Sequence, residues 1–185
     1  NSVKSGKEEN IDTLPGFGKP APADGWMYRS VLIDTGSTVD VFNDPSIFSH
    51  LVKSFTRVQV ANGRQHQLER QGLAKIYTYD SCGRPVSIPM PNAHCDPSFK
   101  PLFSVGRAEK RKMEVHIAPG ETPHIRLASG RRVPLRRQRA GDSWLYYLDF
   151  LVPKSSTIDS ELDVQNLACM AAPKPDRYVV DICAG

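Results

Sequence analysis

The hydrophobic positions of this chain fall in short runs separated by turn residues, which is typical of many short strands rather than of a helical bundle. Residues 28–33 form one such run, and the turn Asp34-Thr35-Gly36-Ser37 follows it directly. Val41 and Phe42 begin a second strand, and further strand patterns occupy residues 58–60, 68–77, 114–118, 125–127 and 144–152. The sequence therefore predicts an all-β fold.

Turn signals divide these strands into hairpins. Asn62-Gly63 lies between two alternating segments, which is a strong short-range hairpin signal. A second hairpin is expected to turn at Ser81-Cys82-Gly83-Arg84. Five prolines favour an extended, turn-rich path over residues 85–101, and the helix-forming residues 104–113, with their basic end, predict one short helix.

Composition indicates one globular unit between two looser ends. With 185 residues, 39% of them hydrophobic, the chain can form one ordinary core. We expect a flexible leader over residues 1–25, a folded domain over 26–152 and a linker over 153–185, where acidic residues become more frequent. Neither a membrane span, a signal peptide nor a paired cysteine motif is visible, which favours a reduced, cytoplasmic setting.

Asp34 is the main candidate for chemistry, although Asp-Thr-Gly by itself is also a common turn or helix cap. Gly36 can offer its amide to the carboxylate, and the Thr35 hydroxyl can reach a second copy. Two such carboxylates a few ångströms apart share one proton, so that one activates water and the other acts as an acid, without a metal or other cofactor. The sequence has no second Asp-(Ser/Thr)-Gly, so this chemistry requires a homodimer.

The order of these motifs resembles the retropepsins, and more narrowly the proteases of copia-type retrotransposons. The segments that carry the resemblance are 34–38 (DTGST), 58–63 (VQVANG), 72–76 (GLAKI), 102–106 (LFSVG) and 145–148 (LYYL), and together they span about residues 28–152. The resemblance implies a retropepsin-like closed β-barrel with a flap hairpin and one short helix, one lobe per subunit of a homodimer.

The same resemblance implies roles for individual residues. Asp34 is the catalytic acid and base, and Thr35 and Gly36 orient the pair. The tip of the flap, which closes over the substrate, consists of Val60, Ala61, Asn62, Gly63 and Arg64. Leu102, Phe103 and Ser104 pack behind the catalytic turn, and this register is favoured over the alternative Ser104-Val105-Gly106. The implied activity is an aspartic endopeptidase that processes its own Gag-Pol-like polyprotein within cytoplasmic virus-like particles.

Asp40 and a cluster of arginines can each be interpreted in two ways. Asp40, six residues after Asp34, either lines a substrate channel or is solvated, and we favour the solvated reading. A basic cluster without an acid could contact RNA phosphates or form a solvated hairpin, which we favour because interleaved aromatic residues are missing. The cluster consists of Arg126, Arg131, Arg132, Arg136, Arg137 and Arg139, and the RNA contact would involve Arg131, Arg132, Arg136 and Arg137. The histidines and Cys95 lack zinc-ligand spacing, so no metal site is predicted.

Two rival functions remain open at this stage. A degenerate or domesticated retroelement domain could have lost catalysis and act as an RNA- or protein-interaction module. A host aspartic protease with a different substrate would carry the same motifs, and the sequence separates it poorly from a retroelement enzyme.

Overall fold

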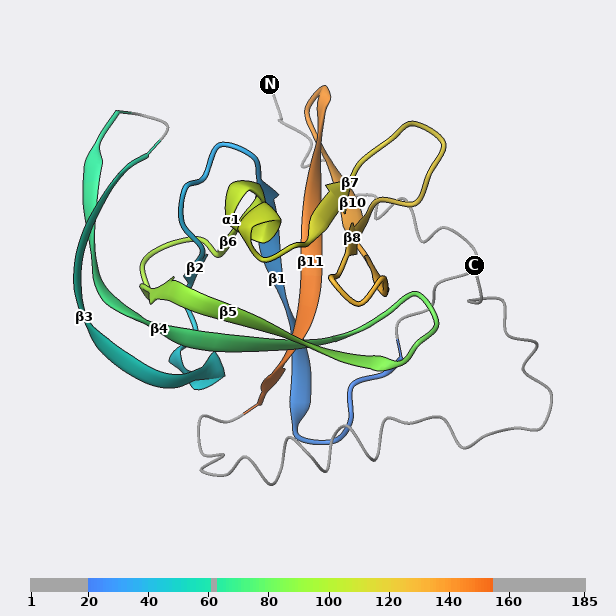
Figure 1. Ribbon diagram of the computed structural model, residues 1–185, viewed down its shortest axis with the longest axis horizontal. Coiled ribbons are helices and arrows are strands. Elements are labelled where there is room, and N and C mark those ends of the chain that lie inside the picture. The colour runs from blue at the N-terminus through green and yellow to red at the C-terminus, as the bar shows by residue number, and fades with distance from the viewer. Residues whose placement is uncertain (1–19, 61–62, 155–185) are drawn as a thin grey trace, which may run out of the picture.

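The computed structural model describes residues 20–60 and 63–154, and this part of the chain is mostly β-strand with one short α-helix (Figure 1). The predicted all-β fold class with one short helix is confirmed at this level. The strands are β1 (Trp26–Asp34), β2 (Val41–Phe42), β3 (Phe48–Gln59), β4 (Gln65–Tyr79), β5 (Pro85–Cys95), β6 (Leu102–Ser104), β7 (Glu114–His116), β8 (His124–Arg126), β9 (Arg132–Pro134), β10 (Arg136–Ala140) and β11 (Ser143–Pro153). The α-helix α1 (Val105–Lys110) follows β6, and a 3-10 helix η1 (Pro45–Ile47) precedes β3.

Most of the predicted leader and most of the predicted linker lie outside the described residues. In the part of the chain that the structure describes, no helix has both the length and the apolar character needed to cross a membrane.

Eight strands form one sheet in the order β10-β11-β1-β6-β2-β5-β4-β3. Strand β1 lies between β11, which is antiparallel to it, and β6, which is parallel to it. Leu151 of β11 also pairs with Tyr77 of β4, so the pairings return on themselves through β1, β6, β2, β5, β4 and β11. Strands β7, β8 and β9 form a separate three-stranded sheet.

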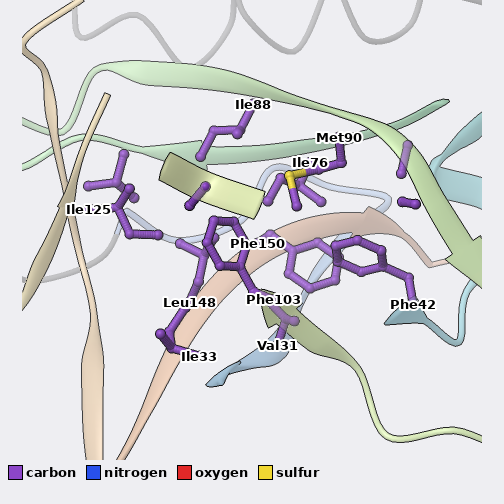
Figure 2. Close-up of a cluster of buried hydrophobic side chains, with 14 of the residues drawn as sticks. Val31, Ile33, Phe42, Ile76, Ile88, Met90, Phe103, Ile125, Leu148 and Phe150 are labelled. Carbon is purple, nitrogen blue, oxygen red and sulfur yellow. The ribbon is translucent and has the colours of Figure 1, made fainter. Parts of the chain in front are cut away.

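The core lies where the long β4 and β5 cross the pair of β1 and β11 (Figures 1 and 2). Alternation along β1 turns Val31 and Ile33 inward, and β4 and β5 contribute Ile76 and Ile88. Phe42 and Phe150 meet edge to face, with their ring centroids 5.9 Å apart. Burial of each such side chain contributes about 1.5–3 kcal/mol, so this cluster is the main support of the sheet.

The hairpin of β3 and β4 is longer than its sequence pattern predicts. The pattern marks only residues 58–60 on the first strand, whereas β3 begins at Phe48. Register shifts interrupt its pairing with β4 between Phe48 and Leu51 and again between Lys53 and Thr56. Each shift gives β3 an extra residue, which disrupts the alternation from which a strand is recognised.

Two further elements differ from the sequence expectation. Residues 85–95 form one continuous strand, β5, despite their prolines, and it pairs with β4 from Pro85 to His94. Its pairing shifts register between Met90 and Ala93, where β5 has one extra residue and Asn92 has a positive φ of 58°. Strand β10 was not among the predicted strands, although its arginines were expected to belong to a solvated hairpin, and it pairs with β11 at the edge of the sheet. The turn between β4 and β5 lies where it was predicted, and Gly83 has the positive φ of 73° that favours glycine there.

Candidate active site

Asp34 is the last residue of β1, and the parallel strand β6 lies directly beside it. The register pairs Ile33 with Phe103 and Asp34 with Ser104. Because Val31 and Ile33 are anchored in the core, the end of β1 is fixed up to the residue that carries the carboxylate. Asp34 is half-buried, whereas Thr35 and Gly36 are exposed. Strand β1 therefore holds the Asp34 carboxylate in a fixed position near the protein surface.

The turn itself gives the carboxylate a hydrogen-bond donor. The amide of Gly36 donates to Oδ1 of Asp34 at 2.8 Å. A Cβ built on Gly36 would lie 3.4 Å from that oxygen, an ordinary contact, so the single chain alone does not require glycine at this position. Within residues 20–60 and 63–154, no group therefore gives Gly36 a steric reason to be glycine.

The predicted supporting segment lies behind this turn. Strand β6 contains Leu102, Phe103 and Ser104, while Val105 and Gly106 already belong to α1, so the favoured register is the one beside Asp34. Phe103 is fully buried in the core. Ser104 begins α1 as its N-cap, with its hydroxyl 3.3 Å from the amide of Arg107.

Asp40 corrects a sequence expectation, because it is fully buried rather than solvated. Its Oδ1 accepts the amide of Ser104 at 2.9 Å, and its Oδ2 lies 2.6 Å from Nη1 of Arg111. A buried carboxylate is tolerated when a cation and hydrogen bonds compensate its charge. Arg111 lies 71 residues further along the chain, so no local pattern could reveal the pair.

The hairpin of β3 and β4 carries the predicted flap tip. Val60 accepts the amide of Gly63 at 2.8 Å and donates its own amide to the carbonyl of Arg64 at 2.9 Å. Gly63 has a φ of 80°, which suits glycine in such a turn. Ala61 and Asn62 were also assigned to the tip, and they lie outside the described residues.

A contact that the sequence did not indicate ties this hairpin to the loop after β5. Nε2 of His66 lies 2.6 Å from Oδ2 of Asp96, and its ring lies 5.3 Å from the ring of Phe99. Burial would raise the pKa of the Asp96 carboxyl, but hydrogen bonds from His66 and Ser98 lower it below its usual value. The carboxylate therefore stays ionised in mild acid and keeps its bond to His66.

The basic cluster is only partly solvated, which corrects the expectation of a solvated hairpin. Arg131 donates to the buried Asp80 at 2.8 Å. Arg136 donates to the buried Asp149 at 3.2 Å and stacks over Tyr147 at 4.9 Å. The aromatic residues that appeared to be missing come from the neighbouring strand β11, where Trp144 also lies under Arg137 at 4.8 Å.

The charges of Arg131 and Arg136 are therefore compensated by Asp80 and Asp149 within the protein, whereas Arg132 is exposed. Contact of this cluster with RNA stays a prediction. No group of three or more metal-ligating side chains gathers within residues 20–60 and 63–154.

Searches against models of known protein families and against curated proteins returned no match.

Proposed function

We propose that this chain is one subunit of a homodimeric, retropepsin-like aspartic endopeptidase. The observation that carries the proposal is the setting of Asp34. Its half-buried carboxylate ends a core strand, accepts the amide of Gly36 at 2.8 Å and stands on an exposed turn. The neighbouring β6 and the long hairpin of β3 and β4 stand in the order that the retropepsin resemblance implies.

The chemistry follows from two such carboxylates at close range. The dyad holds one proton, because two adjacent carboxylates do not ionise together. The ionised Asp34 takes a proton from a water molecule as the oxygen attacks the peptide carbonyl carbon. The protonated Asp34 of the second copy donates to the carbonyl oxygen. As the intermediate collapses, one of its two hydroxyls returns a proton to the ionised carboxylate, the carbon–nitrogen bond breaks, and the leaving amine takes the proton of the other carboxyl group, so the dyad again holds one proton.

A second copy is needed because one chain supplies one Asp-Thr-Gly turn. The exposure of Thr35 and Gly36 supports this, since both residues are accessible to another turn related by a two-fold axis. Gly36 is also easier to understand in a dimer, because the described part of one chain leaves room for a Cβ there. The circuit of strand pairings supports a closed barrel as the lobe of each subunit.

The hairpin of β3 and β4 would act as the flap, and its tip would cover an extended substrate strand and exclude water. The natural substrate in this proposal is the Gag-Pol-like polyprotein of a copia-type element, cleaved within virus-like particles. That choice depends on the motif order of residues 28–152 rather than on any contact of the folded chain.

The decisive variant is Asp34→Asn, which keeps the size of the side chain and removes its acid–base chemistry. We expect the variant to fold like the wild type, as judged by circular dichroism, and to lose cleavage of a fluorogenic extended peptide selected from a pool as a wild-type substrate. At low protein concentration, where monomers and dimers coexist, wild-type activity should rise more steeply than linearly with concentration, because a growing fraction of the chains is dimeric. Cleavage by the variant at the wild-type rate would exclude the proposal.

A further inference from the structure

Resting on the proposed function, we propose that Asp40 and Arg111 are positioning residues, a buried ionic brace that sets the orientation of the catalytic turn. Neither residue touches the reacting atoms. They act through Ser104 and through the chain that leads from Asp34 to Asp40. The brace therefore controls how accurately the Asp34 carboxylate is presented to its counterpart.

Asp40 joins three parts of the fold from one buried position. Its backbone carbonyl accepts the amide of His94 at the end of β5, at 2.9 Å. Its Oδ1 accepts the amide of Ser104 at the end of β6, at 2.9 Å. Its Oδ2 lies 2.6 Å from the guanidinium of Arg111, just after α1. The end of the catalytic turn is thus fixed to β5, β6 and α1 at one point.

Two more contacts hold the middle of the same turn. The hydroxyl of Ser104 donates to the carbonyl of Ser37 at 2.5 Å. Nε of Arg107 donates to the carbonyl of Thr38 at 3.3 Å, and Nη1 of the same side chain reaches the carbonyl of Asn92 at 2.9 Å. Both donors belong to the junction of β6 and α1, so that junction and the turn move together.

The position of this junction depends on the charge pair. The Asp40 side chain is fully buried, and that of Arg111 is 14% exposed. Arg111 is fixed further by packing over the ring of Phe103, with its guanidinium 5.5 Å from the ring centroid. Without Arg111, none of the described residues supplies a counter-charge within hydrogen-bond reach of Oδ2, and the buried carboxylate must draw water or move outward. Movement of Asp40 displaces Ser104 and the turn, and an error of about 1 Å at a reacting group can cost about 100-fold in rate.

The chain offers a matched control for a purely structural role. Asp80 is a second buried aspartate with an arginine partner, Arg131, whose Nε lies 2.8 Å from Oδ2. That pair joins the turn between β4 and β5 to the three-stranded sheet rather than to the catalytic turn. Arg111→Gln and Arg131→Gln therefore make the same chemical change to a buried pair, and only the first should affect Asp34.

The test measures kcat and KM per folded protein with the fluorogenic peptide, and amide hydrogen exchange over residues 34–40, in the full chain. For Arg111→Gln we expect kcat to fall by about 10- to 100-fold with KM changed by less than about threefold. Exchange over the turn should become at least about tenfold faster. Arg131→Gln should leave kcat per folded protein and turn exchange at wild-type values.

Should Arg111→Gln fail to fold, Asp40→Asn decides by the same two readouts, because the near-isosteric amide can still accept the Ser104 amide while losing its charge. The brace is overturned if a folded variant of either residue keeps wild-type kcat and wild-type exchange over the turn. The exchange measurement needs no activity. The two proposals can therefore fail separately. An active Asp34→Asn would contradict the proposed function, whereas amide exchange over residues 34–40 tests the role of Asp40 and Arg111 whether or not the protein is active.

Discussion

Gly72→Ala should destabilise the protein by breaking the contact between β4 and the irregular part of β3. Gly72 is buried and pairs with Leu51, next to the register shift that begins after Phe48. A Cβ at this position would lie 2.0 Å from the carbonyl oxygen of His50 and 3.1 Å from its carbonyl carbon. Both atoms belong to the backbone, so rotation of a side chain cannot relieve the clash.

The size of the effect follows from that geometry. The carbonyl of His50 would have to retreat by about 1.4 Å, from 2.0 Å to the 3.4 Å at which ordinary contact begins. Overpacking in a well-ordered interior typically costs about 1–3 kcal/mol and sometimes more. We expect a loss of at least about 2 kcal/mol in the free energy of unfolding, a large part of the about 5–15 kcal/mol that a domain usually has.

Urea unfolding followed by tryptophan fluorescence and circular dichroism measures this loss. Gly106→Ala is the matched control, because a Cβ on Gly106, inside α1, would meet nothing within 4 Å. Alanine there should stabilise the chain by up to about 1 kcal/mol, as expected for glycine replaced within a helix. Equal stabilities of Gly72→Ala and the wild type would refute the packing that we describe between His50 and Gly72.

Two further predictions concern carboxylates that are held by hydrogen bonds. Asp80→Asn should lower the free energy of unfolding by at least about 2 kcal/mol at pH 7. Burial raises the pKa of Asp80, but bonds from the Arg84 amide and from Arg131 hold it below its usual 3.8. The variant's deficit should therefore persist above pH 3.8 and vanish as the pH falls through the lowered pKa; a deficit unchanged at pH 2 in urea titrations would contradict this. His66→Ala should speed amide exchange along β3 and β4, because it removes the contacts to Asp96 and Phe99. His50 is exposed on the same hairpin, so the control His50→Ala should leave exchange unchanged. Equal exchange in both variants would show that the contacts of His66 do not hold the hairpin.

Much of the fold could be predicted because local patterns reflect local geometry. The apolar run before Asp34 is β1, and the glycine signals at Gly63 and Gly83 mark the two hairpin turns. The helix over residues 105–110 lies inside the predicted segment. These features depend on neighbours in the sequence, so the sequence alone carries the necessary information.

What could not be predicted depends on partners distant in the sequence. Asp40 looked solvated because its cation, Arg111, is 71 residues away. Most of β3 was missed because its extra residues interrupt alternation, and β10 was missed because its apolar neighbours lie on β11. His66 gave no signal of its contact with Asp96, since neither residue belongs to a recognisable motif.

In the candidate site, too, the residues that belong to a sequence motif were predicted and those paired only by the fold were not. Asp34, Gly36 and Ser104 were identified from their motifs, and the folded chain brings Asp34 and Ser104 side by side on paired strands. The buried pair of Asp40 and Arg111 behind them was not foreseen, because its two residues lie 71 positions apart in the sequence.

The central claim is that each chain supplies half of a catalytic site, and mixing subunits tests it most directly. Wild-type chain and Asp34→Asn would be combined in equal amounts, allowed to exchange subunits, and assayed with the fluorogenic peptide at constant total protein. Random pairing leaves about one quarter of the dimers with two intact carboxylates, so we predict about 25% of the wild-type activity. A value of about 50%, as independent monomers would give, would contradict the account.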